Sequence, residues 1–439
     1  MTRRPQVAGG RGGVARLAAA AGGLLLVAGL LGVGLVACGG GSDGSGGGGT
    51  PTTITWYAGS IDQRQNDFRQ ILVDEFEAAH PDITVNVTFG PVDTDVNRAE
   101  ITAALRSGHD APDVYLGDVV WPAQFARDHL AMPLDQVMGA DFWRRFDPAA
   151  LAAARYRGRT YAAPLFTDRA VLFYRTDLVP RPPTSWEQLA DEARSLRASG
   201  QVADGFVWQG APYEGLTCVW TELSADAGGA AVNRAGTGST IDSPAGVKAL
   251  GFLRGLVTSG ATPAGVTGFE ETDADQIFAS GQAAFLRSWN PTYGRLSGPG
   301  SAVSGHVGVA SLPAFAGRPG PGFSTVGGWS LYVNPHTRNL GAVSTFIRWM
   351  TDQEAQRSLV RLAQLPTNAA VRADPAVRAN PLMATGLAAR AVTRPAATPA
   401  YPAVSRAIYT NVSAAIGGSE SIPAALHAAS TRIDQALPG

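Results

Sequence analysis

The chain has 439 residues, a hydrophobic fraction of 45%, a charged fraction of 16% and a formal net charge of −1 at pH 7. This composition is typical of a soluble globular protein, and the near-zero charge excludes a basic nucleic-acid-binding surface. The six histidines show no ligand spacing, so we expect no metal site. The sequence has no phosphate-binding loop, nucleophile elbow or dinucleotide fingerprint, and we expect no cofactor.

The N-terminus is an export signal rather than part of the folded body. Four arginines precede an apolar run over 17–37, which ends in small residues before Cys38. This pattern predicts a lipoprotein signal peptide over 1–37, with lipidation of Cys38. The Gly/Ser-rich residues 38–52 then form a flexible tether. We expect the mature protein outside the cytoplasm, anchored to the outer face of the cell membrane; a transmembrane anchor is the alternative, because the run is nearly long enough to cross a bilayer.

The folded body begins with alternating strands and helices. At about 390 residues it is too long for one core, which predicts two lobes. Strands are expected at 53–57, 83–87 and 112–116, and helices at 66–80 and 99–107. This β-α-β-α-β order predicts a parallel, doubly wound sheet that binds its ligand beyond the carboxyl ends of the strands.

The stretch 159–178 follows these elements. Asp168 and Arg169 stand at an expected bend between two apolar runs, and 170–174 reads as a buried strand. Charge carried into a buried setting does not favour stability. We therefore interpret the stretch as a crossing between two lobes where the backbone meets a ligand. The alternative is an ordinary loop that leads into a core strand.

Several phrases in succession identify a family. They are TITWY, PDVYLGDVVWPAQFA, GRTYAAPLFTDRAVLFYRTDL, FASGQAAFLRSWNPTYG and STVGGWSLYVNPHT. This succession covers essentially the whole mature chain. It resembles the family 1 extracellular solute-binding proteins of sugar ABC importers, and among them most of all the trehalose- and maltose-binding lipoproteins.

The resemblance implies an α/β, two-lobed periplasmic-binding-protein-like fold of type II, with a hinge of two to three crossings. The implied crossings lie at 160–168, at 285–290 and near 332–337. The implied N-lobe is 54–166 plus 288–332, and the implied C-lobe is 167–287 plus 333–439. Sugar binding would close the lobes. The implied partners are ABC permease subunits and the membrane, the latter through the lipid anchor only, and the protein is expected to be a monomer.

A sugar site needs carboxylates and amides around the rim of the sugar and an aromatic ring against its face. Asp118, at the end of an expected strand, is the first candidate acceptor, unless it caps the following helix. Trp289, on the second implied crossing, is the candidate stacking platform, unless it is core. The further candidates for sugar binding are Asp168, Glu271, Arg394, Gly328, Asp62, Trp121, Tyr57 and Glu214.

Three of these candidates have their own alternatives. Glu271 could instead favour a helix N-terminus, and Arg394 could be a solvated loop arginine. Asp168 stands where close members of the family tend to carry an amide. An ionised aspartate only accepts hydrogen bonds, so this difference leaves the sugar and its linkage open.

We expect a binding protein without catalysis, whose ligand is a disaccharide or short α-glucan. Trehalose is favoured and a maltose-type sugar is possible. One alternative is a different cargo, such as a peptide, polyamine or metal chelate. The other is a secreted glycoside hydrolase that uses Asp118 and Glu271 as its acid and base pair.

Overall fold

The computed structural model describes residues 51–59, 67–108 and 111–437. These residues belong to one compact unit, Gly49–Gly439. The predicted signal peptide, Cys38 and Asp62 lie outside the described residues. Within the described ranges, no helix is both long enough and apolar enough to cross a membrane.

The first elements confirm the predicted β-α-β-α-β order. They are β1 (Thr52–Tyr57), α1 (Phe68–Ala79), β2 (Ile83–Thr88), α2 (Thr94–Ser107) and β3 (Val114–Asp118). β1 pairs in parallel with both β2 and β3. The α1 helix forms because Asp67 caps its first turn, and it packs because Phe68, Leu72 and Phe76 form one buried stripe.

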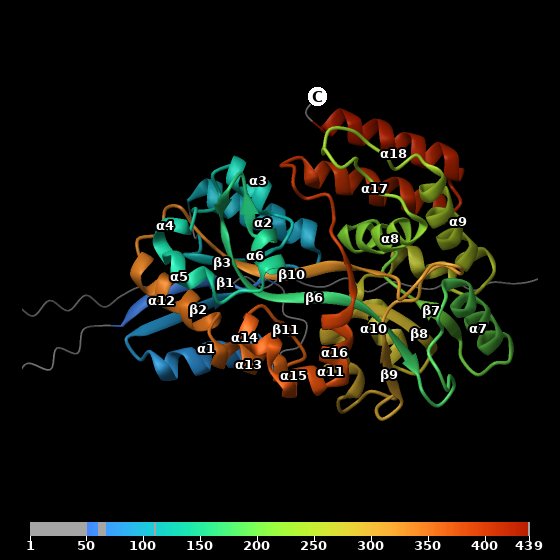
Figure 1. The fold of residues 1–439 in the computed structure, drawn as a ribbon, viewed down its shortest axis with the longest axis horizontal. Coiled ribbons are helices and arrows are strands. Elements are labelled where there is room, and N and C mark those ends of the chain that lie inside the picture. The colour runs from blue at the N-terminus through green and yellow to red at the C-terminus, as the bar shows by residue number, and fades with distance from the viewer. Residues whose placement is uncertain (1–50, 60–66, 109–110, 438–439) are drawn as a thin grey trace, which may run out of the picture. The chain divides into compact units, whose positions relative to one another are not determined.

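Two long strands join the two lobes. β6 (Ala162–Arg175) pairs with β10 (Phe323–Val333) along its first part and with β8 (Ala283–Trp289) along its second. β10 in turn pairs with β3. The sheet order is β2-β1-β3-β10-β6-β8-β7, and both long strands run through the middle of Figure 1.

Two predictions need correction here. The sheet is mixed rather than parallel throughout, because β10 runs antiparallel to β3 and to β6. The bend expected at Asp168 and Arg169 is absent, because both residues lie inside the continuous strand β6. Pairing with β10 on one side holds the strand straight through its charged positions.

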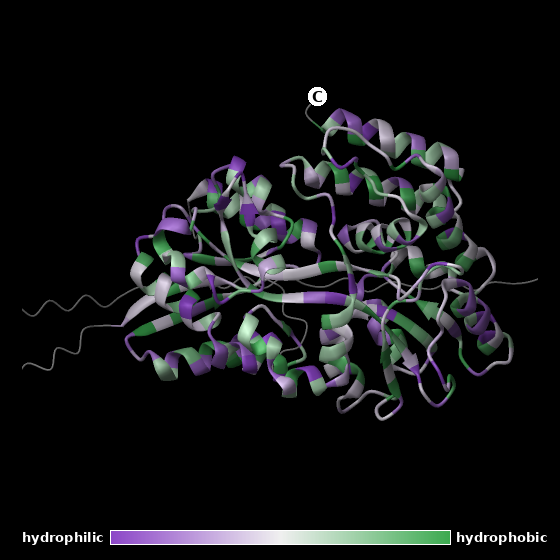
Figure 2. Cartoon of the chain, viewed as in Figure 1, coloured by the Kyte–Doolittle hydropathy of each residue, from purple (hydrophilic) through white to green (hydrophobic). Residues whose placement is uncertain are grey.

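The C-lobe surrounds β7 (Asp204–Val207), β8 and β9 (Val307–Ala310). Its helices are α7 (Trp186–Ala198), α8 (Glu214–Ala227), α9 (Pro244–Thr258), α10 (Glu271–Ala279), α11 (Tyr293–Ser297), α16 (Pro381–Ala388), α17 (Tyr401–Ile416) and α18 (Ile422–Ala436). Figure 2 shows green apolar and purple polar positions following one another along these helices. The core of this lobe contains Trp186, Trp220 and Phe285.

The shorter elements complete the fold. They are α3 (Pro122–Arg127), α4 (Asp135–Met138), α5 (Ala140–Trp143), α6 (Pro148–Ala153), β4 (Arg155–Tyr156), β5 (Arg159–Thr160), η1 (Ala264–Gly268), η2 (Asn290–Thr292), α12 (Leu340–Met350), α13 (Gln353–Arg361), β11 (Leu365–Pro366), α14 (Ala369–Ala373), α15 (Pro375–Ala379) and β12 (Arg390–Val392). The segment after β12 leads into α17 and carries Arg394.

The core packing differs from the predicted division of the chain into lobes. Leu296 and Val303, which fall in the predicted N-lobe segment 288–332, pack in one cluster with Phe173 and Leu286. The reason is that the chain after β8 returns through α11 and β9 to the same strand, β6. It does not cross to the N-lobe until β10.

A second difference concerns α12, which the predicted division places in the C-lobe. Phe346 of α12 packs against Trp56 and Phe76, with ring centroids 5.3 and 5.1 Å apart. This helix therefore covers the N-lobe part of the sheet, beside α1. The apolar stripe of α12 is clear in the sequence, but it does not specify the sheet against which it packs.

Candidate functional site

Asp118 lies at the end of β3 and is 6% exposed. Arg394 donates to it from two nitrogens, Nη2 to Oδ1 at 2.9 Å and Nη1 to Oδ2 at 3.2 Å. Such a bidentate ion pair is among the stronger polar contacts in proteins. The alternative role of Asp118 as a helix cap is wrong, because α3 starts at Pro122 and its N-cap, Trp121, makes no side-chain capping bond.

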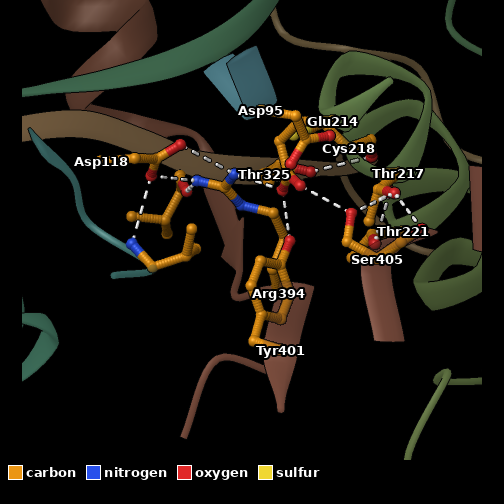
Figure 3. A network of polar contacts seen from close by, with 12 residues as sticks. Asp95, Asp118, Glu214, Thr217, Cys218, Thr221, Thr325, Arg394, Tyr401 and Ser405 are labelled. Carbon is orange, nitrogen blue, oxygen red and sulfur yellow. Dashed lines mark hydrogen bonds and ion pairs between the residues drawn. The ribbon is translucent and has the colours of Figure 1, made fainter. Parts of the chain in front are cut away.

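Glu214 is the second carboxylate of this cluster. Its carboxylate receives Arg394 Nη1 at 2.6 Å, Ser405 Oγ at 2.6 Å and the hydroxyl of Tyr401. Burial raises the pKa of Glu214, and the charge of Arg394 opposes that rise. Figure 3 shows Arg394 between the two carboxylates. Arg394 thus ties together β3, the start of α8 and the segment that leads into α17; it is a buried ion-pair residue, not a solvated loop arginine.

Trp289, the last residue of β8, is partly buried and held from two directions. Its indole N–H donates to Glu271 Oε1 at 3.1 Å, and Glu271 also accepts the Tyr213 hydroxyl at 2.5 Å. The Arg287 guanidinium lies 4.4 Å from the ring centroid. These contacts fix the orientation of the ring and place a cation over it.

Arg287 is itself immobilised in the core. Its guanidinium bonds Glu222 through Nε at 3.0 Å and Nη2 at 2.5 Å, and Gln209 through Nη1 at 2.8 Å. Both members of the ion pair are 1% exposed. A buried, fully engaged guanidinium is a rigid support for the indole.

Asp168 lies on β6, opposite Gly327 of β10. A Cβ added to Gly327 would stand 3.1 Å from the Trp289 ring and 3.3 Å from the Asp168 Cβ, so the indole and the acid are neighbours over this glycine. Burial raises the pKa of Asp168 to about 7; Arg169 lowers it and Asp118 raises it further. Asp168 and Trp289 are thereby brought next to the Asp118–Arg394 pair.

Gly328 has a φ of 124°, and an added Cβ would lie 2.4 Å from the carbonyl oxygen of Phe166. A glycine is therefore needed for the close pairing of β10 with β6. The register of this pair shifts between Trp329 and Ser330, just beyond it. The close approach at Gly328 is to β6. Strand pairing alone therefore explains why this position is glycine, and no ligand is needed to account for it.

Two further candidates are part of the core. Trp121 stacks on Phe125, with centroids 5.1 Å apart, and lies edge-on to Trp329 at 5.9 Å. Tyr57 donates its hydroxyl to Glu100 at 3.2 Å. Both Trp121 and Tyr57 are buried. Trp329 is only partly buried, and it lies beside Gly59, since a Cβ added to that glycine would stand 4.0 Å from its ring.

The structure thus brings six candidates into two adjoining groups. Asp118, Glu214 and Arg394 form one, and Trp289, Glu271 and Asp168 form the other. Sequence reasoning missed the residues that hold them in place, namely Tyr213, Glu222, Arg287, Tyr401 and Ser405. Of these, only Arg287 lies in a quoted motif, FASGQAAFLRSWNPTYG.

A cavity of about 840 Å³ also borders Arg394. Its walls come mainly from 119–123, 152–157, 229–237 and 392–399, and they include none of Trp289, Glu271 and Asp168. The cavity therefore adjoins the first group at Arg394 and is separate from the second group. Across the described ranges, no cluster of histidine, cysteine or acidic residues could hold a metal ion.

Comparison with known proteins gives consistent results. The family model of bacterial extracellular solute-binding proteins matches residues 58–357. A probable ABC transporter-binding protein of Deinococcus radiodurans is 35% identical over 302 residues, which are 66% of this chain and 70% of that protein. Both the length of the match and its identity are sufficient to establish the family.

Two solved structures share the fold. Maltose-bound MalE3 of T. maritima is 30% identical, with a TM-score of 0.81 over 88% of this chain and 100% of that one. The GacH receptor of Streptomyces glaucescens, solved unliganded and with acarbose, is 26% identical, with a TM-score of 0.78 over 88% and 98%. The fold is the two-lobed α/β fold of type II periplasmic binding proteins. The chain is therefore a member of the bacterial extracellular solute-binding proteins, the extracytoplasmic binding components of ABC transporters.

Proposed function

We propose that this protein captures a disaccharide, with trehalose favoured and a maltose-type sugar or short α-glucan possible, and delivers it to an ABC importer. The observation that carries the proposal is the fixed indole of Trp289 beside the acids Asp168 and Asp118. The similarity to a maltose-bound and an acarbose-bound protein supports a saccharide ligand.

The chemistry of the two groups suits a sugar. Arg287 covers one face of the Trp289 ring, and the C–H groups of a pyranose would pack against the other. Asp118 and Arg394 together offer acceptors and donors to neighbouring hydroxyls. The Nε of Arg394 has no hydrogen-bond partner among the described residues, which leaves it a donor for the ligand.

The expected affinity is moderate. A disaccharide of about 23 heavy atoms, at about −0.3 kcal/mol per atom, would bind with about −7 kcal/mol, which is a micromolar dissociation constant. This affinity suits capture from dilute medium and release to a permease. We infer binding without catalysis, since both carboxylate oxygens of Asp118 already accept hydrogen bonds from Arg394.

We further propose that β6 and β10 form the hinge, and that sugar binding closes the lobes around it. The pairings of β6 and β10 with strands of both lobes support this division. The protein would act as a monomer, held to the membrane by lipidated Cys38 alone.

A thermal-shift screen of the purified protein against common mono- and disaccharides, polyols and short peptides tests the proposal. A ligand that binds only the folded state raises the melting temperature. We expect the largest rise with trehalose or a maltose-type sugar. A rise with peptides or polyols and none with any sugar would contradict the proposal.

A further inference from the structure

We propose that Asp168 binds the sugar as a neutral carboxylic acid that donates its proton to a ligand oxygen. This inference rests on the proposed function and adds to it the hydrogen-bonding character of one residue of the site. It makes Asp168 a residue that determines which ligand oxygen can occupy the position next to Trp289.

The first support is an unmet hydrogen bond. Asp168 is 8% exposed, and its Oδ1 has no hydrogen-bond partner among the described residues. A buried polar oxygen without a partner is unfavourable, and an unpaired buried charge is more so. The carboxyl therefore needs a proton, a partner supplied by the ligand, or both.

The second support is that the arginines of the site donate to groups other than the Asp168 carboxyl. The guanidinium of Arg169, the next residue, donates at 2.8 Å to the main-chain carbonyl of Asp168 rather than to its carboxyl. Arg394 is engaged by Asp118 and Glu214. No ion pair to Asp168 exists within the described part of the chain, although Arg169 is its neighbour in sequence.

The third support is the set of groups that surround the carboxyl. β3 contributes Asp118, whose negative charge disfavours a second charge nearby. β6 contributes Arg169, which favours ionisation and is only partly buried. The other neighbours are the uncharged Trp289 ring of β8 and the Gly327 backbone of β10. Burial outweighs the one cation, and a pKa of about 7 for Asp168 is the result.

The neutral form changes what the site can recognise. A carboxylate only accepts hydrogen bonds, whereas a protonated carboxyl both donates and accepts. Only the protonated form can donate to a ring or glycosidic oxygen, which has no hydrogen of its own. Asp168 would then act as a hydrogen-bond donor beside Asp118, whose carboxylate is paired with Arg394.

The test is calorimetric titration of trehalose and maltose into the wild-type protein from pH 5 to pH 9. We expect constant affinity up to about pH 6 and a fall of about tenfold per pH unit well above pH 7, because the sugar complex needs the proton. In that range, binding should take up one proton, measured in two buffers that differ in ionisation enthalpy.

Variants separate this role from a structural one. Asp168→Asn, which donates without titrating, should bind with little pH dependence, and Asp168→Ala should bind weakly at every pH. Asp275→Asn is the matched control: burial also raises the pKa of Asp275 to about 7, but its carboxylate accepts from Thr292 at 2.9 Å. This control should keep the wild-type profile.

A flat wild-type profile with tight sugar binding would overturn the inference while leaving the proposed function intact. A profile of Asp168→Asn that falls as steeply as the wild-type profile would also overturn it. If neither sugar, nor any other that the thermal-shift screen identifies, binds at any pH, the proposed function itself fails.

Discussion

Removal of the Arg394 guanidinium tests how the centre of the site is held together. Arg394→Met keeps an unbranched apolar stem and deletes the charge. It leaves Asp118 and Glu214, which are 6% and 7% exposed, without the cation that compensates them. Three donated bonds of 2.6, 2.9 and 3.2 Å to carboxylates are lost at once.

We expect Arg394→Met to lower the free energy of unfolding by about 3–5 kcal/mol, the usual effect of breaking a buried ion pair on one side. The loss should be smaller at pH 5 than at pH 8. Burial already raises the pKa of Glu214, and without Arg394 this pKa rises further. A group whose pKa is raised by folding contributes stability at low pH and loses it as the pH rises through the folded value.

The assay is urea unfolding followed by circular dichroism at both pH values. Arg181→Met, at an exposed arginine, is the matched control and should change stability by less than about 0.5 kcal/mol. The triple variant Asp118→Asn/Glu214→Gln/Arg394→Met removes all three charges and should recover most of the loss. A loss below about 1 kcal/mol for Arg394→Met alone would refute the reasoning.

Further predictions concern separate parts of the chain. Gly328→Ala should lower the free energy of unfolding by at least about 2 kcal/mol, because the added Cβ would meet Phe166 and φ is 124°. The control Gly294→Ala places its Cβ in open space and should have little effect. Equal urea midpoints for the two variants would contradict this prediction. Burial raises the pKa of Asp168 from 3.8 to about 7, so the wild-type protein should lose stability as the pH rises from 4 to 8. Asp168→Asn does not titrate and should become more stable than wild type over this range, by up to about 4 kcal/mol. Parallel pH–stability curves for the two proteins would argue against this prediction. Cys38→Ser should move the protein from the membrane fraction to the soluble fraction, and membrane retention would disprove lipid anchoring there. Incubation with trehalose or maltose should release no glucose, and sustained release would show catalysis.

The local patterns of the sequence were sufficient to predict the first half of the N-lobe. The alternation of apolar and polar residues in β1 and the apolar stripe of α1 are patterns among residues close together in the sequence. Both elements form where expected. The same kind of pattern identified Asp118 at the end of its strand, whereas Trp289 was proposed from the crossing that the family resemblance implied. The resemblance to a family supplied Arg394 and Glu214, which no local pattern relates to each other.

What the sequence could not predict depends on distant partners. Arg287 reads as one charge in an apolar strand, and its partner Glu222 lies on α8, 65 residues earlier in the chain. Glu214 meets Ser405 across 191 residues. The family resemblance implied a second crossing at 285–290, whereas the chain first returns to β6 through β9, and only β10 pairs with β3.

The most direct test of the central claim is calorimetric titration of the best sugar from the screen into wild type, Trp289→Ala and Trp143→Phe at one pH. Trp143 lies in the N-lobe core against Phe142 and Phe146, away from Trp289, and serves as the control indole. We predict micromolar binding for wild type and for Trp143→Phe, and at least tenfold weaker binding for a folded Trp289→Ala. Equal affinity in all three proteins would place the sugar elsewhere and contradict the site described above.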